Sequence, residues 1–260
     1  MKRTAKLTTI FSMTVLDKPL SREYPEIDTR ATPAGKPVAV VQCNNGLADM
    51  NAWMKTYYEL GEVIGVNLDE EELSAKLFRY SMQGDPSCGG VTVIGYLSGE
   101  HVTDFESGCP VVLRNPAEPF SLANFLRAQL YSALASLAIG IRILKRENVA
   151  IHQLTGHGEL FRIPGVGQQL LADAINVPVT VMKTATEDSS AYGMALLAAY
   201  RVNRAEGETL DSYLKNRVFF NTERSVLSPN AEGVKGFQAY LERFEKSLKV
   251  ERAAIGGYTY

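Results

Sequence analysis

The sequence predicts an α/β protein in which helices pack against a sheet. The strongest observation is that residues 149–202 alternate between strand-like and helix-like segments with short connections. A second observation is that two β-rich runs, residues 8–16 and 36–43, lie early in the chain. The third is composition, because 45% of the 260 residues are apolar and 22% are charged, as in globular proteins with a substantial core.

The early β-rich runs predict two strands joined by residues 17–35, a proline-containing segment too polar to lie in a core. Residues 47–66 then predict an amphipathic helix, because apolar side chains recur at helical spacing. These side chains are Met50, Trp53, Met54, Tyr57 and Leu60. We interpret this stripe as core rather than as a shelf for a ligand.

A polar helix is predicted over about residues 69–82, and the glycines and proline of residues 83–90 end it. Residues 91–97 read as a strand, and residues 98–119 as a long irregular stretch with several prolines. These predictions place one further strand in the middle of the chain.

The longest helix signal covers residues 121–148. Ser121 can cap its first turn, and Lys145 and Arg146 suit its last turn. Because this helix is apolar almost all round, we expect it to be buried between layers.

The second half continues with alternating elements. Residues 149–156 and 178–182 predict strands, and residues 166–175 and 190–202 predict helices. A short segment at residues 210–215 follows, and a final helix begins after Asn230. One face of this helix is apolar and consists of Val234, Phe237, Leu241, Phe244 and Leu248.

Charge and cysteine content exclude several classes of protein. The net charge of −2 gives no field that would attract nucleic acid or an anionic membrane. The three cysteines have no metal-ligand spacing, so we interpret them as reduced, buried side chains of a cytoplasmic protein. No run approaches the roughly 18 apolar residues of a membrane helix. The N-terminal residues 1–16 read as a strand rather than as a signal peptide.

A glycine-rich turn between a strand and a helix is the main candidate for a binding site. Residues 152–179 read HQLTGHGELFRIPGVGQQLLADAINVPV. Glycine lets a backbone approach a ligand closely, and a helix start offers unpaired N–H groups with a partial positive charge. The spacing matches neither a phosphate loop nor a dinucleotide fingerprint. From these residues alone, a structural turn and a phosphate-binding turn both remain open.

Several segments together resemble the FGGY family of carbohydrate kinases, in its xylulokinase and ribulokinase-like branch. The chain contains GGVTVIGYLSGEHV and a following helix with Arg127 and Ala128 at the Arg-Ala position of the family. It also contains the adenosine motif LTGHGELFRIPGVGQQLLADAINVPV and the closing helix TEDSSAYGMALLAAY. The motifs occur in the family's order and cover essentially the whole chain.

This resemblance implies an actin-like ATPase (ribonuclease H-like) domain, with a central mixed sheet flanked by helices. Residues 1–260 are expected to be the C-terminal, nucleotide-binding half of a two-domain sugar kinase, and the N-terminal sugar-binding domain is expected to be absent. The implied reaction phosphorylates a pentulose, xylulose or ribulose, with ATP and Mg²⁺. The family's base is an aspartate upstream of residue 1, so no catalytic residue is assigned and the chain alone is expected to be inactive.

The resemblance also indicates residues for binding ATP or ADP. Thr8 and Thr9 correspond to the phosphate loop, where the family has a glycine before the hydroxyl residues and this chain has Leu7. Gly156, His157 and Gly158 correspond to the adenosine turn, and for His157 a structural hydrogen bond is favoured over proton transfer. Glu187 matches a glutamate that glycines follow in the family, whereas serines follow it here.

The sequence also contains four polar residues outside these motifs whose roles can be considered. Asn44, Asn45 and Asp49 are interpreted as caps of the helix that follows, with contact to the sugar-binding half as the alternative. His101 is expected to be exposed. For the chain as a whole, the alternative functions are a non-catalytic interaction domain, which could pair with the other half or form a homodimer, and a pseudokinase that still binds nucleotide.

Overall fold

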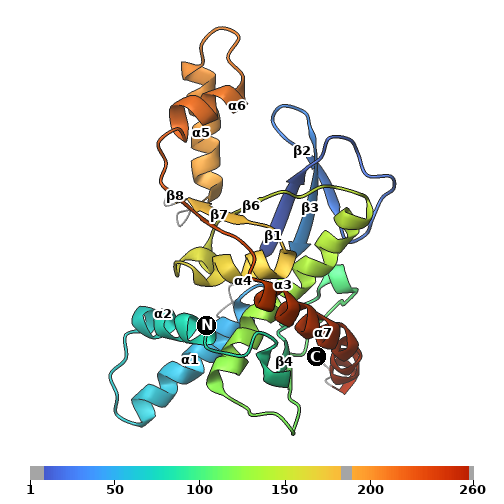
Figure 1. Ribbon diagram of the computed structural model, residues 1–260, viewed down its shortest axis with the longest axis vertical. Coiled ribbons are helices and arrows are strands. Elements are labelled where there is room, and N and C mark those ends of the chain that lie inside the picture. The colour runs from blue at the N-terminus through green and yellow to red at the C-terminus, as the bar shows by residue number, and fades with distance from the viewer. Residues whose placement is uncertain (1–8, 183–188, 258–260) are drawn as a thin grey trace, which may run out of the picture.

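The computed structural model describes residues 9–182 and 189–257. Within them, helices and strands form the α/β arrangement that the sequence predicts, and the strands are divided among three small sheets (Figure 1). The long helix α3 (Leu122–Arg146) runs through the middle and contacts α2, α4, α7 and the first two sheets. In the described ranges, no helix is long and apolar enough to cross a membrane.

The first sheet consists of β1 (Ile10–Val15), β2 (Asp28–Ala31) and β3 (Pro37–Cys43), in the antiparallel order β1-β3-β2. Strand β3 is the buried centre, as its run of apolar residues predicts. The sequence did not predict β2, because all four of its residues are exposed and it lacks an alternating pattern. Its pairing with β3 comes from a hairpin rather than from burial.

Two helices follow this sheet. Helix α1 (Ala48–Val63) presents Met50 to the core, and its Trp53 ring meets Phe125 of α3 edge-on at 4.9 Å, so this part of the stripe is core as predicted, whereas Met54 also lines a pocket described below. The prediction was wrong for Leu60, which is 55% exposed near the free end of the helix. In α2 (Glu70–Ser81), the Asp69 carboxylate accepts a hydrogen bond from the backbone N–H of Glu72 and caps the first turn.

The second sheet pairs β4 (Thr92–Ile94) with β5 (Val111–Leu113) in antiparallel fashion. Strand β4 is shorter than predicted, because residues 95–97 leave the ladder. Strand β5 corrects the prediction that residues 98–119 are irregular throughout. It has only three residues, so its pattern is too short to recognise before its partner is known.

Helix α3 confirms the prediction of a buried helix. Nearly all of its residues from Ala123 to Leu144 are buried, and they form the centre of the hydrophobic core. The Ser121 hydroxyl accepts a hydrogen bond from the N–H of Asn124 at 3.2 Å, so the predicted cap is also confirmed. At the other end, the Lys145 ammonium donates to the carbonyl oxygen of Ile175 at 2.8 Å.

The third sheet is mixed. Strand β6 (Leu154–Gly156) runs parallel to β7 (Val179–Met182), and β8 (Arg224–Leu227) pairs with β7 in antiparallel fashion. Helix α4 (Val166–Ile175) makes the crossover between β6 and β7. Strand β6 is shorter than the predicted run from residue 149, and β8 was not predicted because its residues are mostly exposed.

The C-terminal helices differ in how they pack. Helices α5 (Ser189–Asn203) and α6 (Leu210–Tyr213) extend away from the rest of the molecule, and a π-helical turn (Leu214–Val218) follows them (Figure 1). Helix α7 (Ala231–Gly257) packs on α3, α4 and β4. Its predicted apolar face is confirmed, since Phe237, Leu241 and Phe244 are buried in the core.

Candidate functional site

The glycine-rich turn begins where β6 ends and leads through a 3₁₀ turn, η3 (Glu159–Phe161), into α4. Gly156 is buried, and a Cβ atom there would lie 2.5 Å from the Phe161 ring. Gly158 has a φ of +96°, and the space beside it, where a Cβ atom would lie, is open. Packing therefore requires glycine at 156, whereas backbone conformation requires it at 158.

At the start of α4 too, one glycine is required by backbone conformation and another by packing. Gly165 has a φ of +84° and precedes the helix with open space beside it, and no side chain caps the helix. A Cβ atom at Gly167 would collide with the carbonyl oxygen of Leu160 in η3. The first turn of α4 is therefore packed closely against η3, and the backbone accessible to a ligand is the segment around Gly158 and Gly165.

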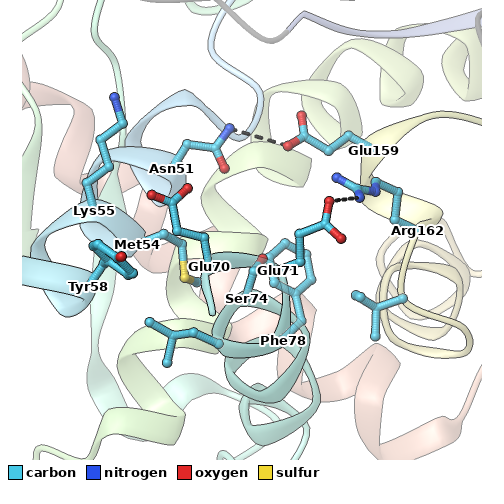
Figure 2. A pocket seen from close by; sticks show the side chains of 12 residues that line it. Asn51, Met54, Lys55, Tyr58, Glu70, Glu71, Ser74, Phe78, Glu159 and Arg162 are labelled. Carbon is cyan, nitrogen blue, oxygen red and sulfur yellow. Dashed lines mark hydrogen bonds and ion pairs between the residues drawn. The ribbon is translucent and has the colours of Figure 1, made fainter. Parts of the chain in front are cut away.

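A pocket with a volume of about 350 Å³ adjoins this turn, between α1, α2 and η3. This size is within the usual range for small-molecule sites. Figure 2 shows side chains from the three elements converging on it. Its apolar wall includes Met54 of α1, Leu73 and Phe78 of α2, and Ile163. Its polar lining consists of Asn51, Lys55, Tyr58, Glu70, Glu71, Ser74, Glu159 and Arg162.

Two weak polar contacts join the helices to the segment after the turn (Figure 2). The Asn51 amide donates to a Glu159 carboxylate oxygen at 3.5 Å. The Arg162 guanidinium lies 3.5 Å from the Glu71 carboxylate, and both side chains are more than half exposed. Long contacts between exposed groups add little stability, so these two contacts contribute little to holding the pocket walls together.

None of the described residues predicted to bind ATP is among those that line the pocket. Gly156, His157 and Gly158 directly precede Glu159, which lines the pocket, and His157 itself is exposed. Thr9 is exposed immediately before β1 and does not line the pocket. Thr8 and Glu187 lie outside the described residues.

Sequence reasoning missed most of the pocket wall. Asn51, Lys55 and Tyr58 lie on α1 at a spacing of three or four residues, which places them on one face beside the apolar stripe. That spacing is a visible signal, but a polar face of a helix is usually only solvated. The facing residues of α2 and η3 could not be assigned to the same site without the tertiary structure.

The prediction that Asn44 and Asn45 cap α1 was wrong, because the residue at the start of α1 is Leu47 and no side chain caps it. Instead, one Glu100 carboxylate oxygen accepts hydrogen bonds from the backbone N–H groups of Asn44 at 2.9 Å and Asn45 at 3.2 Å. The Asn45 side-chain oxygen in turn accepts from the N–H groups of Leu97 and Ser98. This buried network ties the loop before α1 to the loop after β4.

Burial changes the titration of two carboxylates near this loop. Burial raises the pKa of Glu100, although the N–H groups of Asn44 and Asn45 oppose the shift. Burial also raises the pKa of Asp49 in the first turn of α1. Both side chains are almost fully buried, while His101 is exposed, as predicted.

The chain has an actin-like fold, and a pocket of about 350 Å³ lies next to its glycine turn. A comparison with protein-family models matches residues 8–202 to the C-terminal domain of the FGGY family of carbohydrate kinases. This match covers most of the chain, and the chain therefore belongs to that family. A comparison with curated protein sequences found no match.

Solved structures of several kinases resemble the chain in fold. A ligand-bound xylulose kinase from Lactobacillus acidophilus is 15% identical with a TM-score of 0.72, over 96% of this chain and 47% of that one. A gluconate kinase from the same organism is 14% identical with a TM-score of 0.72, over 96% and 47%. A Plasmodium falciparum glycerol kinase with ADP is 15% identical with a TM-score of 0.66, over 94% and 45%. The chain spans less than half the length of these proteins.

Proposed function

We propose that residues 1–260 form the nucleotide-binding half of a sugar kinase and that the pocket between α1, α2 and η3 holds the adenine of ATP or ADP. The observation that supports this proposal is the position of the pocket, whose lining includes Glu159, the residue that follows the Gly156–Gly158 turn. Its wall of Met54, Leu73 and Phe78 can bury a flat aromatic base. The polar residues that line the pocket can form hydrogen bonds with the nitrogen atoms at the edge of that base.

The phosphates of the nucleotide would then extend along the accessible backbone around Gly158 and Gly165. Both glycines have open space beside them, and the adjacent start of α4 carries a partial positive charge. The family resemblance adds Thr8, Thr9, His157 and Glu187 to the proposed set of contacts. In this arrangement, adenine and phosphates are held by different segments, and their contributions can be separated by mutation.

Mg²⁺ is part of the proposal as a companion of the nucleotide. Proteins usually bind this ion through one or two carboxylates together with substrate phosphates. Among the described residues, no group of three or more His, Cys, Asp or Glu side chains could hold a metal ion by itself. Glu159, the pocket carboxylate next to the turn, is the described residue that would hold such an ion together with the phosphates. The ion would supply charge neutralisation of the phosphates.

Nucleotide binding is tested by thermal unfolding with and without ADP, since a ligand that binds only the folded state raises the melting temperature. Ser74→Trp fills the pocket and is expected to abolish the rise caused by ADP. Lys76→Trp places the same side chain on an exposed part of α2 and should leave it unchanged. No rise for the parent chain, or an equal rise for both variants, would overturn the proposed pocket.

The path of the phosphates is tested by calorimetry with ADP and with adenosine. Gly158→Val is expected to weaken ADP binding at least tenfold and adenosine binding much less, because its branched side chain occupies the open space beside the turn and strains the backbone at a φ of +96°. Equal losses for both ligands would place the phosphates elsewhere.

We further propose that the sugar is a pentulose, that a separate sugar-binding half supplies most of its contacts, and that the complete enzyme is cytoplasmic. The chain alone should release no ADP above blank in a coupled assay with xylulose or ribulose, and turnover would contradict this. With a sugar-binding half added, faster turnover on xylulose or ribulose than on gluconate or glycerol supports a pentulose substrate. Faster turnover on gluconate or glycerol argues against it.

A further inference from the structure

A second pocket lies at the C-terminal end of α3, beside the loop that precedes β2. Its volume is about 670 Å³. It is lined by one residue of the loop, five of α3 and one of α7, namely Glu26, Ile139, Arg142, Ile143, Lys145, Arg146 and Glu245. Arg142 lies about 25 Å along α3 from Phe125, which contacts α1, because an α-helix rises about 1.5 Å per residue. This pocket is therefore distinct from the one between α1, α2 and η3, with which it shares no lining residue.

One face of α3 forms a wall of this second pocket. Ile139, Arg142, Ile143 and Arg146 follow one another at helical spacing, which places them on the same side of the helix. The two isoleucines make part of this wall apolar. The two arginines, together with Lys145, add three positive charges within a short stretch of the helix. Positive charges this close repel one another unless anions neutralise them.

The described residues neutralise only part of this charge. The Arg142 guanidinium forms an ion pair with the Glu245 carboxylate. The Lys145 ammonium donates to the carbonyl oxygen of Ile175 at 2.8 Å, which occupies one of its three donors. Arg146 makes no hydrogen bond or ion pair within the described part of the chain. Lys145 and Arg146 therefore line the pocket without a counter-ion.

The carboxylate next to Arg146 in the sequence is already occupied. Glu147 accepts hydrogen bonds from the backbone N–H of Ser21 at 2.8 Å, from the Ser21 hydroxyl at 2.6 Å and from the Tyr24 hydroxyl. These bonds tie the loop before β2 to the end of α3. Beyond Glu26, the side chain of Ile27 is buried in the core. The loop is therefore anchored on both sides of Glu26, and this part of the pocket is formed without a ligand.

The loop contributes a negative charge to the same pocket. Among the described residues, the Glu26 carboxylate has no ion-pair partner, and its Oε2 atom is buried without a hydrogen bond. Glu26 therefore lies too far from Lys145 and Arg146 to pair with either of them. A carboxylate that has lost part of its hydration is stabilised by a ligand that brings a hydrogen-bond donor. The pocket thus offers unpaired positive groups on α3 and an unpaired acceptor on the loop.

We propose that this pocket binds a small organic phosphate, with the phosphate group on Lys145 and Arg146 and a hydroxyl group donating to Glu26. Arginine and lysine are the side chains that proteins use to hold phosphate. Two unpaired positive charges match a phosphate monoester, which carries nearly two negative charges at pH 7, better than a carboxylate, which carries one. The carbon atoms between the phosphate and the hydroxyl group cover Ile139 and Ile143.

The first test is calorimetry with glycerol 2-phosphate as the probe, and with inorganic phosphate and glycerol for comparison. Glycerol 2-phosphate is expected to bind at least tenfold more tightly than inorganic phosphate, and glycerol should not bind. Arg146→Gln should weaken the binding of both phosphates about tenfold. Arg201→Gln is the matched control, because Arg201 is an exposed arginine in the last turn of α5, and this variant should bind like the parent.

The second test uses Glu26→Leu, for which the two phosphates should respond in opposite directions. This variant should weaken glycerol 2-phosphate about fivefold, because the acceptor for its hydroxyl group is lost. It should bind inorganic phosphate more tightly, because a negative charge is removed from the pocket. A general loss of structure would weaken both ligands.

A final control separates this site from the proposed nucleotide pocket. Ser74→Trp fills that pocket and should leave the affinity for glycerol 2-phosphate unchanged, whether or not ADP binds there. The proposal would be overturned if glycerol 2-phosphate does not bind or if Arg146→Gln behaves like Arg201→Gln. Parallel losses of both phosphates in Glu26→Leu, or a loss of the probe in Ser74→Trp, would overturn it as well.

Discussion

The buried carboxylate of Glu251 predicts how the stability of this protein depends on pH. Glu251 lies on α7 and is fully buried. One of its oxygens accepts a hydrogen bond from the N–H of Cys109 at 2.7 Å, and the other has no hydrogen-bond partner among the described residues. Burial raises the pKa of this carboxyl to about 7, and the Cys109 N–H opposes the shift only in part.

The size of the effect follows from the difference between this pKa and its ordinary value of 4.5. Each pKa unit corresponds to about 1.4 kcal/mol, so the shift amounts to at most about 3 kcal/mol. Because the folded state holds the proton more tightly, this group's contribution to the free energy of unfolding falls as pH rises from about 4.5 to about 7. Above the folded pKa, the loss is complete.

Glu251→Gln removes the charge and keeps an acceptor for the Cys109 N–H. The variant is therefore expected to be more stable than the parent at pH 8, by up to about 3 kcal/mol, and to lose this advantage near pH 4.5. Urea unfolding followed by circular dichroism at both pH values measures the difference. Glu242→Gln, at an exposed position of the same helix, should change little at either pH. A gain that is equal at both pH values, or a loss at pH 8, would refute the reasoning.

Two further pairs of variants test the core and the turn. The Tyr240 hydroxyl lies within hydrogen-bonding distance of two buried carbonyl oxygens and shares its one proton between them, whereas the nearby Tyr131 hydroxyl has no hydrogen-bond partner among the described residues. Tyr240→Phe should therefore lower the free energy of unfolding by about 1–2 kcal/mol, and Tyr131→Phe should leave it unchanged or raise it, as measured by urea unfolding. Gly156→Ala and Gly158→Ala should each lower it by about 1–3 kcal/mol, for different reasons. Adding Phe161→Leu should recover stability only for Gly156→Ala, whose methyl group meets that ring.

Elements with a strong local signal could be predicted from the sequence. Helix α4 begins and ends at the predicted residues, because its apolar spacing and its flanking Gly165 and Asn176 are local features. Helix α3 was recognised from its cap at Ser121 and its continuous apolar surface. The short strands β2, β5 and β8 were missed, because three or four partly exposed residues become a strand only through their partner.

Of the candidate site, too, only the parts with a local signal could be predicted from the sequence. The sequence by itself determined the glycine turn at residues 156–158 and the family resemblance, because both are carried by contiguous residues. Only the tertiary structure decided that a pocket lies beside that turn, since Asn51 and Glu159 are 108 residues apart in the chain. It also decided that Asn45 bonds to the loop after β4. Such contacts depend on how distant segments pack, and a local pattern carries no information about the segment it will meet.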